Sequence, residues 1–159
     1  MEKTIKLDSK TSVKVTNNVS WMLVYRDQFG RDIVPALIPI LNGFIDAAVE
    51  IAKATDGRPT GVKELLQALD TEALRDAIFD LAGLEIVDLI NIVWAMAKAA
   101  DDELDGPEEW ARSLPAFPLD VILPTIGDMV LRCMISSKNW KRLQEAMKNL
   151  GPLQSSLSS

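Results

Sequence analysis

Two short stretches near the start of the chain alternate apolar and polar residues. Ile5 and Leu7 precede the polar segment DSKT, and Val13 and Val15 follow it. Alternation with a period of two places the apolar side chains on one face of a strand, and a short polar segment between two such runs is typical of a turn. We therefore predict a β-hairpin over residues 1–16. Because an isolated hairpin is only marginally stable in water, it must pack on the helices that follow.

After residue 16 the apolar positions change to helical spacing. In NNVSWMLVYRDQFG, residues 17–30, polar residues that favour helix N-termini come before Met22, Tyr25 and Phe29, and Gly30 stands where a helix would end. Asp32 can cap a further helix through residues 33–57, and one or two more helices are predicted over residues 62–82. A last helix is predicted after residue 138.

Two predicted helices are apolar around most of their circumference. In residues 84–100 one narrow stripe carries the polar side chains Glu85, Asp88, Asn91 and Lys98. In residues 119–135 the stripe consists of Thr125, Asp128 and Arg132. Trp94 lies opposite the first stripe, so it is predicted to be a core residue. Two such helices present more apolar surface than one small core covers, and we therefore expect the protein to form homo-oligomers.

These elements predict a mainly α fold: a helical bundle of about five to seven helices with a small N-terminal antiparallel β-hairpin. A chain of 159 residues with 48% hydrophobic content can bury one sizeable core. Residues 1–150 are therefore predicted to form a single helical domain that includes the 1–16 hairpin segment. The polar ending, residues 151–159, is predicted to be a flexible C-terminal tail.

Charge and composition narrow the classes of partner. The net charge of −6 repels phosphate backbones and anionic lipids, so we expect neither nucleic acid nor a membrane as a partner. The apolar stretches are interrupted too often to reach the roughly 20 residues that span a bilayer. The single cysteine, Cys133, and the polar start of the chain indicate a reducing cytoplasmic location.

Few residues offer chemistry for catalysis. The chain contains no histidine, which removes the usual general base and the usual metal ligand. Cys133 lies among apolar residues and is expected to be a small buried side chain. The segment DDELDG, residues 101–106, resembles the start of a calcium-binding loop, but Arg112 occupies the twelfth position, where a glutamate is needed. We expect no metal and no cofactor, and an enzyme that uses carboxylates alone remains a minor alternative.

Charge is unevenly distributed along the chain. Residues 101–109 carry six acidic residues and no basic one, whereas the segment after residue 138 is basic. The two segments could bind each other within one chain or head to tail between copies. The candidate contact residues are Asp101, Asp102, Glu103 and Asp105 on the acidic side, and Lys138, Trp140, Lys141 and Arg142 on the basic side.

The stretch WMLVYRDQFGRDIVP, residues 21–35, has two interpretations. It can be a core helix that ends at Gly30 and is followed by a helix capped by Asp32. It can also provide a contact surface, for which the candidates are Trp21, Tyr25, Phe29 and Arg31.

The same stretch carries a family resemblance. Placed after a strand pair and before the apolar segment PALIPIL, it resembles the tail assembly chaperones of long-tailed phages and prophages of Gram-positive bacteria. The apolar helix LEIVDLINIVWAMAKAAD fits the same layout. The resemblance implies a non-enzymatic protein that binds the tape-measure protein, helps recruit tail-tube subunits, acts in the host cytoplasm and is absent from the mature virion. The alternative is a helical protein-interaction or regulatory module with another partner.

Overall fold

The computed structural model describes residues 1–38, 85–135, 138 and 141. Its elements, in chain order, are β1 (Glu2–Lys6), β2 (Ser12–Thr16), α1 (Ser20–Phe29), α5 (Ile86–Ala100), α6 (Pro107–Ser113) and α7 (Leu119–Met134). This part of the chain is therefore mainly α with an N-terminal antiparallel hairpin. Most of the predicted helix over residues 33–57, the helices over 62–82 and the tail over 151–159 lie outside the described residues.

The hairpin forms as its alternating pattern predicts. Ile5 pairs with Val13 and Lys3 with Val15, so the apolar residues of both strands share one face, which is buried. The turn is closed by Asp8, whose carboxylate accepts hydrogen bonds from the backbone N–H groups of residues 10 and 11 at 2.8 and 2.6 Å. These bonds favour the ionised carboxylate and lower the pKa of Asp8.

Helix α1 ends where the sequence indicates. Gly30 adopts a left-handed backbone conformation with φ of 73°, and its N–H donates to the carbonyl of Arg26 at 2.8 Å. This is the usual glycine C-cap of a helix. The carboxylate of Asp32 then accepts a hydrogen bond from the Val34 N–H at 3.0 Å, and the next helical residues begin at 34. The predicted helix end is confirmed at Gly30, whereas Asp32 lies one residue before the N-cap, Ile33, whose carbonyl accepts the first helical hydrogen bonds.

Helices α5 and α6 also begin at capping signals. Glu85 and Asp88 form a reciprocal capping box at the start of α5. Pro107 and two glutamates open α6, in line with the preference of proline and acidic residues for helix N-termini. The loop between the two helices covers residues 101–106.

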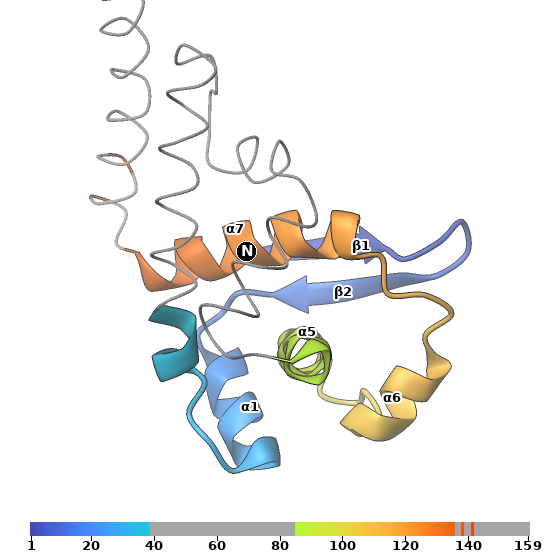
Figure 1. The fold of residues 1–159 in the computed structure, drawn as a ribbon, viewed down its shortest axis with the longest axis horizontal. Helices are drawn as coiled ribbons and strands as arrows, with labels where there is room; N and C mark the ends of the chain where they lie inside the picture. Colours follow the sequence, from blue (N-terminus) through green and yellow to red (C-terminus); the bar gives the residue numbers. More distant parts are fainter. Residues whose placement is uncertain (39–84, 136–137, 139–140, 142–159) are drawn as a thin grey trace, which may run out of the picture.

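Figure 1 shows the hairpin between α7 and α5, with α1 packed beside α5 and α6 beyond it. Helix α5 contacts β2 and α1, whereas α7 contacts β1. The hairpin therefore does not lie outside the helices: its buried face joins one continuous apolar core with them. Packing between helices stabilises the hairpin, which would be only marginally stable in isolation. Among the described residues, no helix is both long and apolar enough to cross a membrane.

The positive φ at Gly30 leads to a testable prediction. Replacing Gly30 with alanine should lower the free energy of unfolding by about 1 kcal/mol, because a Cβ disfavours left-handed backbone. No heavy atom lies within 4 Å of the added Cβ, so a steric clash adds nothing to this cost. Gly106 is the matched control, because its Cβ would also meet open space but its φ is −59°. Chemical denaturation of both variants measures the difference, and an equal effect at the two positions would contradict the backbone explanation.

Candidate functional site

A groove open to solvent lies between α1 and the C-terminal half of α5. Its volume is about 310 Å³, and we call it the α1–α5 groove; it is lined by Val24, Asp27, Gln28, Trp94, Lys98 and Asp102. Val24 and Trp94 provide apolar surface, whereas the carboxylates of Asp27 and Asp102 belong to exposed residues. An apolar centre with a charged rim is typical of a surface that binds another protein.

Helix α5 holds the acidic loop at the edge of this groove. The indole N–H of Trp94 donates to the Asp105 carbonyl at 2.9 Å. The ammonium of Lys98 donates to the carbonyls of Asp102 and Leu104 at 2.5 and 2.6 Å. Because these bonds are made to the loop backbone, the carboxylates of residues 101–105 remain directed to solvent or the loop itself. The groove therefore has an ordered acidic rim.

A second set of contacts fixes α1 against α5. Phe29 lies between Tyr25 and Trp94, with ring centroids 4.7 and 5.7 Å away, and its packing on Trp94 is edge-on. The guanidinium of Arg31 donates to the Asp88 carboxylate at 2.5 Å and to the Tyr25 hydroxyl at 3.3 Å. Arg31 thus links the end of α1 to the start of α5.

The structure corrects the proposed contact role of two aromatic residues. Trp21 and Tyr25 are 0% and 1% exposed, so neither can contact a partner from the surface. Both project from the side of α1 that packs into the core, while Phe29 is half-buried and Arg31 is engaged by Asp88. The sequence showed that these residues share a helix but not which side of that helix faces the core.

Trp21 also lies near the only cysteine. Its indole N–H is buried and has no hydrogen-bond partner among the described residues. Burial raises the pKa of the Cys133 thiol, and the polar N–H of Trp21 opposes this shift to a smaller extent. A raised pKa keeps the thiol protonated and therefore weakly nucleophilic. Cys133 is partly buried and not fully buried as predicted.

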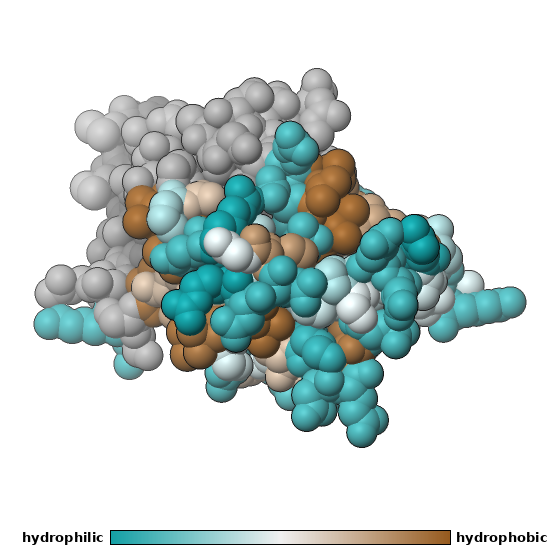
Figure 2. Space-filling view, turned by 90° about the horizontal axis from the view of Figure 1, so that it is seen from below, coloured by the Kyte–Doolittle hydropathy of each residue, from teal (hydrophilic) through white to brown (hydrophobic). Residues whose placement is uncertain are grey.

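The apolar residues that α1 exposes are different ones. Val19, the N-cap residue of α1, and Leu23, within the helix, are 64% and 55% exposed and lie one helical turn apart on its solvent side. We call these two residues the α1 stripe. Asp27 continues the same row into the α1–α5 groove. The i, i+4 spacing of Val19 and Leu23 could have indicated this apolar row from the sequence, but the neighbouring aromatic residues were chosen as candidates instead. Figure 2 shows the surrounding face as mainly hydrophilic with separate apolar patches.

The charged candidate contact residues that the structure describes are exposed. Asp101, Asp102, Glu103 and Asp105 are exposed, and the Asp101 carboxylate accepts a hydrogen bond from the Glu103 N–H. Lys138 and Lys141 are exposed and helical. Trp140 and Arg142 lie outside the described residues. Among the residues that are described, neither lysine forms an ion pair with the acidic loop.

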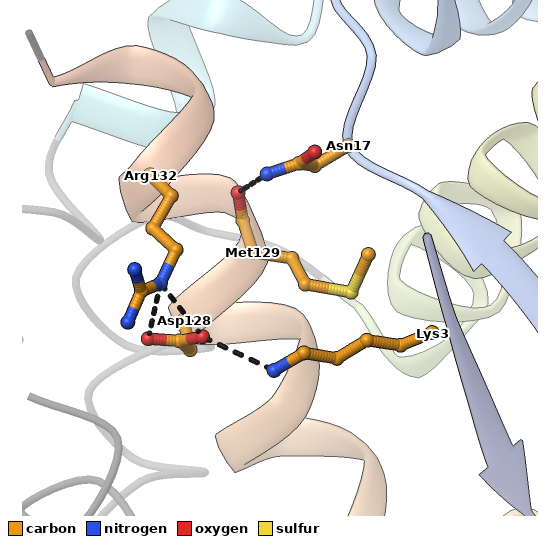
Figure 3. A network of polar contacts seen from close by, with 5 residues as sticks. All are labelled: Lys3, Asn17, Asp128, Met129 and Arg132. Atoms are coloured by element: carbon orange, nitrogen blue, oxygen red, sulfur yellow. Dashed lines mark hydrogen bonds and ion pairs between the residues drawn. The ribbon is translucent and has the colours of Figure 1, made fainter. Parts of the chain in front are cut away.

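Helix α7 requires a further correction. Asp128, predicted to lie in an exposed polar stripe, is 0% exposed. Its carboxylate accepts two hydrogen bonds from Arg132 Nε at 3.1 Å and forms an ion pair with Lys3 of β1 at 3.4 Å (Figure 3). Nearby, the Asn17 side chain donates to the Met129 carbonyl at 3.1 Å (Figure 3). These contacts join the hairpin to α7 and have a structural role.

The exposed apolar surface that was expected on the helices over residues 84–100 and 119–135 is also found elsewhere. Most apolar residues of α5 and α7 are buried, including Trp94 at 3% exposure, because the hairpin and neighbouring segments cover them. The exposed large apolar side chains lie on α1, at the start of α5 and at single positions elsewhere. In the described part of the chain, no group of three acidic, cysteine or histidine side chains is placed to hold a metal ion.

Comparison with known proteins found no matching family model, no similar curated protein and no similar solved structure.

Proposed function

We propose that the chain is a non-enzymatic phage tail assembly chaperone that binds the tape-measure protein and helps recruit tail-tube subunits. The observation that supports this best is the α1 stripe. Val19 and Leu23 expose large apolar side chains within or beside the stretch that resembles the chaperone family. Single exposed apolar residues are common on protein surfaces, but two that are stacked along one helix and bordered by a groove favour protein binding.

The chemistry of the stripe suits an elongated helical partner. An amphipathic helix binds through apolar residues spaced one turn apart, and a row of apolar side chains on α1 presents the same spacing. The tape-measure protein is the partner that the resemblance implies. A chaperone that covers apolar segments of such a long protein would prevent their premature association during tail assembly.

The proposal includes several further properties. Residues 1–150 form one helical bundle of about five to seven helices, and the protein self-associates. It acts in the host cytoplasm, is absent from the mature virion, and binds neither nucleic acid nor membrane. A helical regulatory module with a different partner would use the same stripe, and the experiment below separates the two functions.

Co-expression with the long coiled-coil protein encoded in the same phage genome tests this proposal. The wild-type chain should keep that protein soluble, and Leu23→Asp should abolish the effect because it places a charge in the apolar contact. Ser12→Asp is the matched control, since residue 12 is exposed on the hairpin, outside the stripe. Circular dichroism confirms that both variants fold. Absence of rescue by the wild type would favour the regulatory module, and undiminished rescue by Leu23→Asp would exclude the stripe.

A further inference from the structure

We infer that the α1–α5 groove is the acceptor for the basic helical segment around Lys138 and Lys141 of a second copy of this chain. The inference rests on the self-association included in the proposed function, but not on the identity of the tape-measure protein as partner. The α1–α5 groove and the basic segment are the two surfaces of a head-to-tail contact between copies.

Among the described residues that line the groove, two are carboxylates, Asp27 and Asp102, and one is an ammonium, Lys98. The Lys98 ammonium is directed to the carbonyls of Asp102 and Leu104 and not to either carboxylate. Arg26 approaches Asp27 only to 3.9 Å, and both side chains are more than half exposed, so water weakens that pair. Among the described residues, Asp102 forms no ion pair.

The basic segment has the complementary chemistry. Lys138 and Lys141 are exposed, lie three residues apart in a helical segment and make no ion pair with any described residue. The sequence adds further basic residues at 142 and 148 against one glutamate at 145, with apolar residues at 140, 143 and 147. The helix that this sequence pattern predicts would carry apolar side chains with flanking cations, which suits an apolar groove with an acidic rim.

The direction of the contact follows from the two surfaces being different. Each copy offers one acidic groove and one basic segment, so a contact between them is heterologous, and successive copies form a ring or an open spiral. The α1 stripe borders the groove but faces solvent beside it. A row of copies joined in this way would therefore present a row of α1 stripes to an elongated partner.

Charge reversal on each side of the contact tests the inference. The acceptor variant combines Asp27→Lys with Asp102→Lys, and the donor variant combines Lys138→Glu with Lys141→Glu. The self-association constant of each variant alone should be lower than that of the wild type by a factor of about ten at least, because like charges then face each other. An equal mixture of the two should regain association, since opposite charges again meet at every contact. The matched control, Glu2→Lys with Asp120→Lys, changes the net charge of the chain as the acceptor variant does, at exposed positions outside the groove.

Light scattering and sedimentation at micromolar concentration and low salt give the readout, with circular dichroism as the folding check. Association that weakens with added salt, is lost in each variant and returns in the mixture supports the inference. A wild-type protein that stays monomeric, or an acceptor variant that associates as well as the matched control, overturns it. Solubility rescue of the long coiled-coil protein is measured separately. If the wild-type chain associates through the groove but does not rescue that protein, the chaperone function is contradicted and the groove inference stands.

Discussion

Replacing Trp94 with alanine should lower the free energy of unfolding by about 3–5 kcal/mol, the cost of deleting a large aromatic side chain from a packed core. Trp94 is 3% exposed, packs edge-on against Phe29 and anchors the acidic loop through its indole N–H. For a chain of this length the loss corresponds to a fall in Tm of about 6–20 °C. Thermal and urea denaturation measure it.

Trp94→Phe is the matched control for this prediction. Phenylalanine keeps most of the ring volume but cannot donate to the Asp105 carbonyl, so it isolates the hydrogen bond, which contributes about 0.5–1.5 kcal/mol. We expect Trp94→Phe to cost clearly less than Trp94→Ala. If the alanine variant were as stable as the wild type, Trp94 would not belong to the core, and the packing of α1 on α5 would be wrong.

Removing both cations around Asp128 should have an effect of similar size. In the variant Lys3→Met with Arg132→Met, the carboxylate stays buried and loses its positive partners. Breaking a buried ion pair in this way typically costs about 3–5 kcal/mol, because the remaining charge is neither hydrated nor paired. Urea denaturation of the double variant measures the cost.

Adding Asp128→Leu to that double variant distinguishes the charge effect from lost packing. The third substitution removes the unpaired charge, so the triple variant should be more stable than the double variant, since an apolar group is tolerated where a lone carboxylate is not. A triple variant that is no more stable than the double variant would show that the carboxylate is hydrated, and would contradict the burial of Asp128.

Local features of the fold could be predicted from the sequence because their causes lie within a few residues. The hairpin follows from the alternation around Ile5 and Val13, and the end of α1 follows from Gly30. Asp32 and Pro107 likewise mark helix starts through short-range capping preferences. The burial of Trp94 was predicted from its position opposite the polar stripe of a single helix.

Contacts between distant segments could not be predicted in this way. Asp128 was expected to lie in a solvent-exposed stripe, because helical periodicity does not show that Lys3, 125 residues earlier, lies beside it. The link between Arg31 and Asp88 joins residues 57 positions apart and depends on the packing of α1 on α5. Such pairings are set by the tertiary arrangement, which a single sequence does not display.

The aromatic candidates for a contact surface lie on the buried side of α1. Trp21 and Tyr25 attracted attention because aromatic residues are common in protein interfaces. On α1 they face the core, and the solvent side carries Val19 and Leu23 instead. The acidic side chains of residues 101–105 are exposed, because a run of carboxylates cannot be buried without partners.

Hydrogen–deuterium exchange of the complex with the tape-measure protein tests most directly whether α1 is the partner-binding surface. The proposed function predicts slower exchange on complex formation in peptides covering residues 19–27, where Val19, Leu23 and Asp27 form the exposed row. The hairpin turn around Asp8, an exposed turn outside that surface, should exchange at an unchanged rate and serves as the internal reference. Protection confined to other segments, with α1 unchanged in a stable complex, would contradict the account.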